Sequence, residues 1–450
     1  MKSFAEIPSI DPPAGLVTTG QVPAYLAEMA LEHGPMFTWD VEWRPGERVS
    51  LLFMVGPAAN RFVMQTHREH FSHDLGWTPI VGEWMGKGLL NMDVPDWTLH
   101  RRMMNPAFTS AYVAAYLPIM QRVIATRTRD WAERGEVDLY WEARQITFDV
   151  AATALAGLRP GPVATRLRGL FYSLVAGPDP KEETNEQFAE RWPKIIAELD
   201  DALLPLIAER RQQAKRPGVD GAPVDVLGMI VDARDDQGQP LDDRQVLAHV
   251  KVLLVAGHET TTSLSTWTLY LLSLHPAYRD RVLAELEAAT GSLDTPLSYE
   301  TIRGLKVLDD VVREAGRLYS PVITVPRGVV KDFEFAGFHV PAGVSLRLAL
   351  AGCHRLPSIF QNPDAFEPDR FEPPRDEDKR TPYALVTFGG GPRICIGMGF
   401  AQEEIKAMVL QVLRRYRLEI VDPSSVVHAG WLTGFLPNGC RAKVTAIGPA

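Results

Sequence analysis

Cysteine is scarce in this chain. Its 450 residues include only three, Cys353, Cys395 and Cys440. A small, odd number argues against a disulfide framework and fits a reducing compartment. A chain of this length can bury a large core without metal or disulfide crosslinks. We therefore expect no disulfide bonds to hold the fold together.

Long hydrophobic runs are also missing. The most apolar stretch, residues 246–274, contains His249, Lys251, His258 and Glu259, which interrupt it too often for a lipid-spanning helix. The first 15 residues have no apolar core, which argues against a signal peptide or anchor. We therefore expect a cytoplasmic protein without a membrane anchor.

Positive charge is not in excess. Lys and Arg number 47 against 56 Asp and Glu, which gives a formal net charge of −9. Nucleic-acid binding depends on basic groups that neutralise phosphates, so this balance argues against nucleic acid as a partner. The hydrophobic and charged fractions, 46% and 23%, are those of an ordinary globular protein.

Most of the chain has the hydrophobic periodicity of helices, and no internal repeat is present. Segments 178–185, 216–224 and 235–240 are turn-like but short enough to be surface loops, so we expect a single domain over residues 1–450. The pattern predicts a mainly α protein with small β-sheets. The expected strands cover residues 49–55, 322–329, 333–340 and 344–350. The expected helices cover residues 22–33, 57–69, 96–105, 111–134, 146–156, 188–214, 243–274, 276–289, 298–320 and 397–416.

A glycine-rich loop with one cysteine precedes the last predicted helix. It reads Phe388-Gly-Gly-Gly-Pro-Arg-Ile-Cys395-Ile-Gly397. Free backbone N–H groups at the helix start favour the thiolate of Cys395, which could be a nucleophile, one metal ligand of several, the axial ligand of a haem iron, or a buried structural cysteine. Ile394 stands where a dinucleotide fingerprint needs glycine, no phosphate-loop lysine follows, and no second cysteine has zinc-like spacing.

The long helix predicted at residues 243–274 carries a polar turn, Ala256-Gly257-His258-Glu259-Thr260-Thr261. A glycine followed by threonines is unfavourable in a helix, and threonine hydroxyls can bend it. An acid beside an alcohol can pass protons to a bound oxygen species, although a tolerated polar turn is the simpler reading. A zinc-protease motif is excluded, because its second histidine would fall at Thr262.

Glu314 and Arg317 share one face of the helix predicted at residues 298–320. The spacing is weak evidence by itself, since most such pairs are solvated and worth only a few tenths of a kcal/mol. It recurs at Glu300/Arg303, Glu367/Arg370, Glu372/Arg375 and Glu377/Arg380.

Together these segments resemble a known family. Phe388-x-x-Gly391-x-Arg393-x-Cys395-x-Gly397 resembles the cysteine loop of the cytochrome P450 haem-thiolate monooxygenases. Residues 256–261 resemble that family's oxygen-activating helix, and Phe366-x-Pro368-x-Arg370-Phe371 resembles its meander motif. The resemblance implies the single-domain haem-thiolate fold and haem b (iron protoporphyrin IX), with Cys395 as the axial ligand of the iron.

The resemblance also implies roles for single residues. Ala256 and Gly257 would lie against the haem, Thr260 would be the distal hydroxyl, and Glu259 its acid partner in proton delivery. Glu314, Arg317 and Arg370 would form a buried network that fixes the cysteine loop. The haem propionates would be bound by Trp97, His100, Arg101, Arg327 and Arg393, and Phe388, Gly389 and Gly397 would line the haem on the cysteine side.

Substrate contacts are expected from several separated, mostly apolar segments, which suits a lipophilic molecule such as a fatty acid, terpenoid or steroid-like compound. The expected lining residues are Trp77, Ile80, Val81, Trp84, Leu89, Val322, Ile323, Thr324, Gly434 and Phe435.

The expected reaction inserts one atom of O₂ into a C–H or C=C bond, and a thiolate ligand favours the O–O cleavage this needs. Too few residues follow Cys395 for a fused reductase, so electrons are expected from a separate ferredoxin or flavodoxin-type carrier with its reductase. A peroxide-driven peroxygenase, a haem-thiolate isomerase and a non-catalytic haem sensor or carrier are the alternatives. The Glu259-Thr260 pair argues against the first two.

Overall fold

The computed structural model describes residues 1–44, 47–176, 184–213 and 225–448, and it groups them into two compact units. Unit 1 comprises Met1–Trp77, Arg127–Ala143 and Thr260–Ala450, and unit 2 comprises Thr78–Thr126 and Arg144–Glu259. The predicted mainly α architecture with small sheets is confirmed. The single-domain expectation stays a prediction. Segment 216–224, and 178–185 except for its last two residues, lie outside the described residues.

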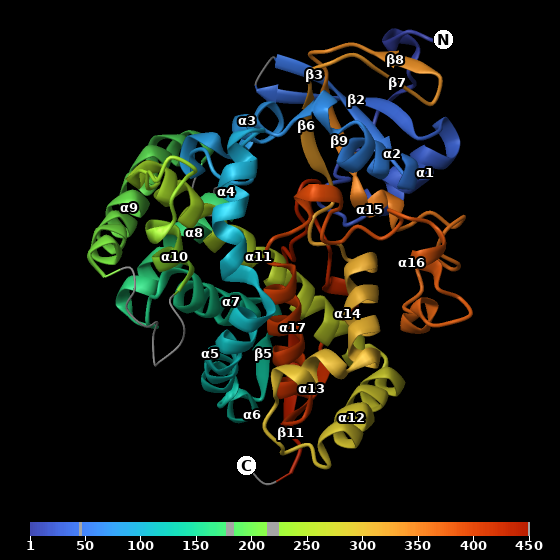
Figure 1. Ribbon diagram of the computed structural model, residues 1–450. Coiled ribbons are helices and arrows are strands. Elements are labelled where there is room, and N and C mark those ends of the chain that lie inside the picture. The colour runs from blue at the N-terminus through green and yellow to red at the C-terminus, as the bar shows by residue number, and fades with distance from the viewer. Residues whose placement is uncertain (45–46, 177–183, 214–224, 449–450) are drawn as a thin grey trace. The chain divides into compact units, whose positions relative to one another are not determined.

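The largest sheet of unit 1 has six strands in the order β1-β2-β3-β9-β6-β4 (Figure 1). Its centre, Leu51 to Val55, is almost wholly buried, as expected for a strand covered on both faces. Sequence reasoning found β3, β6 and β9 but missed β2, which pairs antiparallel with β3. The strands are β1 (Ser9–Ile10), β2 (Met36–Arg44), β3 (Glu47–Val55), β4 (Phe71–Ser72), β6 (Val325–Val329) and β9 (Ser345–Ala349).

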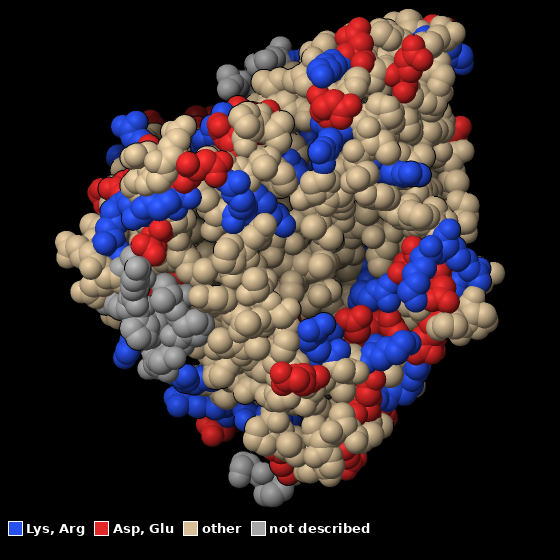
Figure 2. Space-filling view, viewed as in Figure 1, with Lys and Arg blue, Asp and Glu red and all other residues tan. Residues whose placement is uncertain are grey.

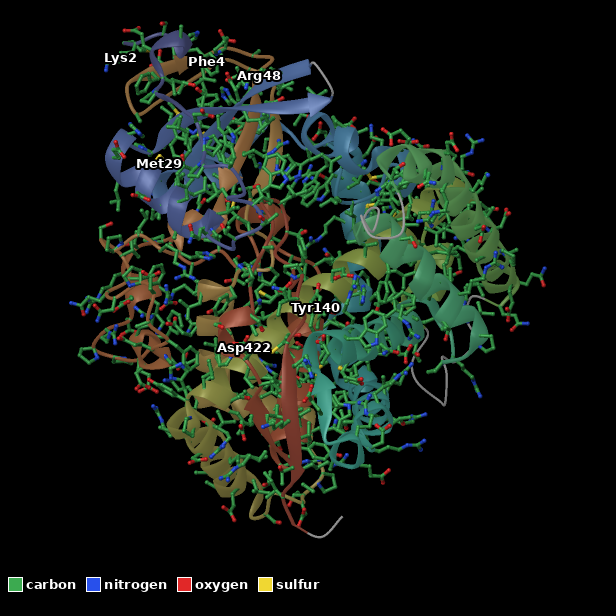
Figure 3. The ribbon with its side chains drawn as sticks, turned by 180° about the vertical axis from the view of Figure 1, so that it is seen from behind. Lys2, Phe4, Met29, Arg48, Tyr140 and Asp422 are labelled. Carbon is green, nitrogen blue, oxygen red and sulfur yellow. The ribbon has the colours of Figure 1, made fainter. Side chains whose placement is uncertain are left out.

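Two smaller sheets complete the β structure of unit 1. The predicted strand at 333–340 is a hairpin, and Lys2 at the N-terminus pairs with Phe338 in it, so the labelled Lys2 and Phe4 lie beside this hairpin (Figure 3). The hairpin strands are β7 (Phe333–Phe335) and β8 (Phe338–Val340). The three-stranded sheet consists of β10 (Tyr416–Ile420), β11 (Arg441–Ala446) and β5 (Glu136–Asp138).

Two helices predicted in unit 1 are interrupted. The pattern at 57–69 forms a short helix followed by a π turn and a 3₁₀ turn. The pattern at 298–320 breaks at Leu305, where the Glu285 carboxylate accepts the N–H groups of Lys306 and Val307 and so begins a new helix. The interrupted pieces are α2 (Pro57–Arg61), η2 (Phe62–Thr66), η3 (Arg68–His70), α13 (Tyr299–Gly304) and α14 (Lys306–Leu318).

The helix predicted at 111–134 breaks after Thr128, and α6 (Trp131–Arg134) is its C-terminal part. The remaining helices of unit 1 are otherwise close to their predicted ranges where a prediction was made. They are η1 (Phe4–Glu6), α1 (Val22–His33), α12 (Pro276–Thr290), α15 (Leu350–Cys353), η6 (Pro368–Phe371), α16 (Glu377–Arg380), η7 (Gly391–Arg393), α17 (Met398–Leu413) and η8 (Pro423–Ser425).

Unit 2 is helical. Neither α3 nor α8 was predicted from the sequence, and Pro79 lies inside α3, where it interrupts the helical pattern. The helices are α4 (Asp96–Met104), η4 (Asn105–Phe108), α8 (Pro162–Ala176), α9 (Asn185–Gln212) and α10 (Val226–Asp232). Among the described residues, four helices run from one unit into the other, namely α3 (Asp74–Met85), α5 (Ser110–Thr128), α7 (Leu139–Ala156) and α11 (Asp243–Leu274).

In the described parts of the chain, no helix is both long enough and apolar enough to cross a bilayer.

Candidate functional site

The cysteine loop is a tight turn that only glycine can make. Gly389 and Gly391 have φ angles of 74° and 65°, in the left-handed region. A Cβ on Gly391 would lie 2.3 Å from the carbonyl oxygen of Met64 in η2, so the loop is in close backbone contact with that π turn. The N–H of Cys395 donates to the carbonyl of Phe388 at 3.0 Å, which closes the loop just before α17.

The three cysteines differ in their surroundings. Cys353 and Cys440 are fully buried, and burial raises the pKa of each thiol to about 12, so both stay protonated at neutral pH. Cys395 is exposed. It is therefore the cysteine of this chain that can bind or attack a partner, since the other two are inert in the core.

Behind the loop lies a buried ion-pair network. Glu314 on α14 accepts two hydrogen bonds from Arg317, at 2.8 and 2.9 Å, and one from Nε of Arg370 at 2.9 Å. All three side chains have an exposed fraction of 0%. Of the five Glu-x-x-Arg matches, the structure thus brings Glu314 and Arg317 together with Arg370, as the family resemblance implied.

The network extends further than the sequence indicated. Nη1 of Arg370 donates to the carboxylate of Glu377 at 2.6 Å, and Arg375 continues the chain of charges from Glu377 to Glu367. Basic and acidic side chains are accordingly interspersed around α16 (Figure 2). In the sequence, Glu377 is one of five Glu-x-x-Arg matches and was expected to form a solvated pair with Arg380. Nothing in its spacing predicts the contact with Arg370.

His354 connects the network to the cysteine loop. Arg317 donates to the backbone carbonyl of His354 at 2.9 Å, and the ring Nε2 of His354 accepts the N–H of Val386 at 3.0 Å. The carbonyl of Val386 in turn accepts the N–H of Gly389 at 2.8 Å. Burial, followed by the nearby Arg317, lowers the pKa of His354 to about 3, so its neutral ring can serve as this acceptor.

The middle of α11 is more exposed than the two buried segments on either side of it. Residues 252–254 before it and 261–268 after it are buried, whereas Ala256 is exposed and Gly257, Glu259 and Thr260 are partly exposed. Small side chains at Ala256 and Gly257 allow a flat partner to approach the helix backbone closely. The polar turn is therefore accessible rather than part of the packed core.

Glu259 is held by an ion pair within unit 2. Its carboxylate accepts hydrogen bonds from Arg144 on α7, at 2.5 Å from Nη2 and 3.2 Å from Nε. The guanidinium lies over the ring of Tyr172, 3.9 Å from its centroid, and the ring Nε2 of His258 lies 3.2 Å from the carbonyl oxygen of Arg144. Burial lowers the pKa of His258 to about 4, so this histidine is neutral.

No group of three or more His, Cys, Asp or Glu side chains in the described residues could hold a metal ion. A group bound through Cys395 would therefore have fewer than three protein ligands from this set, and an iron porphyrin, which can be held by one, meets that condition. A family model described as cytochrome P450 matches residues 14–159 and 180–434. The chain belongs to the cytochrome P450 family.

Known members support this assignment over most of the chain. Cytochrome P450 136 of Mycobacterium tuberculosis is 32% identical over 409 residues, which cover 89% of this chain and 80% of that protein. A sterol 14α-demethylase of Mycolicibacterium vanbaalenii is 27% identical over 390 residues, 85% of each chain. The solved structure of retinoic acid bound cyanobacterial CYP120A1 has a TM-score of 0.82 at 27% identity and covers 98% of this chain and 99% of that one.

As a cytochrome P450, the protein is a haem-dependent monooxygenase. Its residues fit the cofactor. Cys395 offers an exposed thiol at the start of α17, and Ala256 and Gly257 expose a small-residue face on α11.

Among the expected propionate ligands of this cytochrome P450, His100 lies differently from the expectation. Its imidazole is buried, and Nδ1 lies 2.6 Å from Nε2 of His249 on α11, so it joins two helices of unit 2. Trp97 and Arg101 on the same helix, α4, are both partly exposed, and Nε of Arg101 donates to Asn105 at 2.9 Å. The position of His100 beside Arg101 in the sequence could not distinguish a haem ligand from a core contact.

The two expected propionate ligands of unit 1 are placed on different elements. Arg327 lies in β6, buried, with Nη1 donating to the carbonyl of Pro326 at 2.7 Å. Arg393 lies in η7, two residues before Cys395, and is partly exposed, as are Phe388, Gly389 and Gly397.

Of the expected substrate contacts in unit 1, two have side chains that lie in the core. Ile323 is fully buried in an apolar cluster, and Thr324 is fully buried with its hydroxyl donating to the carbonyl of Trp431 at 2.8 Å. Val322 is partly exposed and pairs with Thr433, which brings it beside the segment that contains Gly434 and Phe435. Phe435 is 45% exposed.

The expected contacts on and after α3 are mostly buried. Trp77, Val81, Trp84 and Leu89 each have an exposed fraction below one tenth, and Ile80 is partly exposed. Within unit 2, a residue that sequence reasoning did not identify holds this helix. The buried Lys251 on α11 donates to the carbonyl of Trp84 at 2.9 Å and forms an ion pair with Asp200 on α9.

Proposed function

We propose that this cytochrome P450 inserts one atom of O₂ into a C–H or C=C bond of an apolar small molecule of the fatty acid, terpenoid or steroid class. A separate ferredoxin or flavodoxin-type carrier with its reductase supplies the electrons. The observation that carries the reaction class is Cys395, the exposed thiol of a loop that glycines fold in front of α17. The exposed Phe435 and the partly exposed Val322 and Ile80 support an apolar substrate.

The names of two relatives support one part of this substrate class. One is named for a sterol and another was solved with retinoic acid, and both ligands are apolar isoprenoid-derived molecules. We therefore place terpenoid and steroid-like molecules ahead of linear fatty acids.

In this proposal haem b would be held by Cys395 and would supply the activation of O₂. The small residues Ala256 and Gly257 would allow it to approach α11 closely. Arg327, Arg393, Trp97 and Arg101 would donate to its propionates, whereas His100 joins α4 to α11 through His249. The Glu314–Arg317–Arg370 network keeps Cys395 in position through His354.

Glu259 and Thr260 would deliver the protons that the reaction consumes. Glu259 accepts hydrogen bonds from Arg144, so the carboxylate must exchange this partner for a water or a hydroxyl before it can transfer a proton. Thr260 is the next residue of the helix and is partly exposed, and its hydroxyl would donate the last hydrogen bond of this relay.

The proton role of Thr260 is tested by Thr260→Ala. Without the hydroxyl, we expect NADPH consumption with a surrogate redox system to continue while product falls about tenfold or more, a loss in the range of proton-transfer contributions. The missing product is expected as hydrogen peroxide. The measurement is the ratio of product to peroxide per NADPH oxidised.

The control for this prediction is Thr266→Ala on the same helix. Its hydroxyl donates to the carbonyl of Thr262 at 2.8 Å and is buried, so coupling is expected to be unchanged. If Thr260→Ala couples electrons to product as well as the unsubstituted protein does, the proton role is wrong.

The substrate class is tested by a ligand screen on the haem-loaded protein. Binding of an apolar substrate is expected to change the haem iron from low spin to high spin. This change is measured as a shift of the Soret absorption band. We expect such shifts with isoprenoid and steroid-like compounds and none with sugars or nucleotides. Shifts with polar compounds alone would contradict the proposed class, and product analysis of each binder would then separate oxygenation from simple binding.

A further inference from the structure

Unit 1 contains a stacked pair of oxidisable aromatic rings that the proposed reaction does not use. Trp267 on α11 and Tyr319, the residue after α14, lie parallel, with ring centroids 3.6 Å apart and an interplanar angle of 4°. Tyr270 and His428 contact this pair edge-on, at 5.2 Å and 5.7 Å from the indole. Parallel rings at this separation are in van der Waals contact over their whole faces, so their π electrons overlap.

The pair lies close to the elements that form the site. Trp267 follows Thr260 by two turns on the same face of α11, which is about 10 Å along the helix. One turn nearer, Leu264 packs at Gly316 of α14, where a Cβ would lie 3.6 Å from Leu264 and 2.8 Å from Thr387. Thr387 directly precedes Phe388, so the segment leading to Cys395 meets α11 and α14 here.

The two rings differ in whether they can release a proton. Trp267 is 1% exposed, and its Nε1 has no hydrogen-bond partner in the described part of the chain. An oxidised indole that cannot lose this proton remains a strong oxidant and draws an electron from its neighbour. Tyr319 is partly exposed and lies near the Arg355–Asp364 ion pair, whose aspartate is 80% exposed. Burial raises the pKa of the intact phenol, so the proton is retained until the ring is oxidised and is then released towards solvent.

We propose that Trp267 and Tyr319 form an internal electron-donor route that removes oxidising equivalents from the haem when no substrate consumes them. One electron passes from Tyr319 to Trp267 and from Trp267 to the oxidised haem. Tyr319 loses its phenolic proton to solvent and becomes a neutral radical, and Trp267 returns to its original state. A thiol or ascorbate-type reductant then restores Tyr319 by donating one hydrogen atom.

The inference rests on haem binding at Cys395 but not on the identity of the substrate. It assigns to the stack a protective role, because each electron that it delivers lowers the oxidation state of the haem by one without attack on porphyrin or protein. A stack that only fills the core would stabilise the fold and leave no radical.

The test uses the haem-loaded protein, without substrate, mixed with a peracid and frozen within milliseconds. We expect the unsubstituted protein to show an aromatic radical by electron paramagnetic resonance, and Tyr319→Phe to lose most of it. In both Tyr319→Phe and Trp267→Phe the Soret band is expected to bleach several-fold faster. Product formation with a well-bound substrate is expected to stay unchanged, because coupled turnover leaves no oxidising equivalent behind.

Trp131→Phe is the matched control. Trp131 is also 1% exposed in unit 1 and lies near Tyr416, with ring centroids 6.1 Å apart and tilted rather than stacked. Its radical yield and bleaching rate are expected to equal those of the unsubstituted protein. The reduced carbon monoxide spectrum and thermal unfolding of each variant are recorded first, so that lost haem binding or lost folding is distinguished from a lost route.

Two results would overturn the route. One is an undiminished radical in Tyr319→Phe, which would locate the radical on another side chain. The other is equal bleaching in Trp267→Phe, Trp131→Phe and the unsubstituted protein, which would leave the stack a packing feature only.

Discussion

Cys395→His is expected to abolish the haem-thiolate spectrum and reduce monooxygenation to background. Imidazole is a neutral nitrogen ligand, and it cannot supply the electron density by which a thiolate favours O–O cleavage. The reduced carbon monoxide complex should lose the absorption band typical of a thiolate ligand and show a histidine-type spectrum instead. The absorption spectrum and product yield with a surrogate redox system are the measurements.

Cys440→Ala is the control for this substitution. Cys440 is fully buried, and burial raises the pKa of its thiol to about 12, so its removal changes packing but not the ligand. We expect its spectrum to stay of the thiolate type. A thiolate spectrum that survives in Cys395→His would disprove the assignment of the axial ligand.

Glu314→Gln is expected to destabilise the protein by about 3–5 kcal/mol, because it leaves the guanidinium groups of Arg317 and Arg370 buried without their shared counter-charge. The carboxylate accepts three hydrogen bonds from these two arginines and one from the N–H of Glu367. The free energy of unfolding in denaturant measures the loss. We also expect the variant to bind haem weakly, since the network holds the cysteine loop through His354.

Glu300→Gln is the matched control, since Glu300 and Arg303 have the same i, i+3 spacing on α13. Glu300 is exposed, and exposed pairs of this kind contribute about 0–1 kcal/mol. If Glu314→Gln and Glu300→Gln lowered the free energy of unfolding equally, burial of the Glu314–Arg317–Arg370 network would not be the cause of the loss.

The substitutions of Cys395 and Glu314 are expected to act in different ways, because the two residues lie in different surroundings. Cys395 lies in an exposed loop, so its replacement is expected to change the chemistry and not the fold. Glu314 lies in the core, so its replacement is expected to change the fold first and the spectrum only as a consequence.

Much of the site could be predicted from the sequence because its elements are local. The cysteine loop depends on glycines within ten residues, and Gly389 and Gly391 do adopt the left-handed backbone that this composition favours. The helix predicted at 243–274 is found with the same bounds, since a long periodic pattern determines helix type and length. Context along the chain was also sufficient to choose Glu314 among five equivalent matches.

What the sequence left open depends on contacts between distant segments. His100 pairs with His249, 149 residues away, and Glu377 binds Arg370 rather than remaining a surface charge. Ile323 and Thr324 face the core because of where Trp431 and Leu432 lie. The sequence alone thus determined which residue types lie in the cysteine loop, in the polar turn of α11 and in the Glu314–Arg317 pair, and how far apart they are in the chain. The burial and partner of each side chain were decided by the tertiary structure, because both depend on packing between elements that no local pattern encodes.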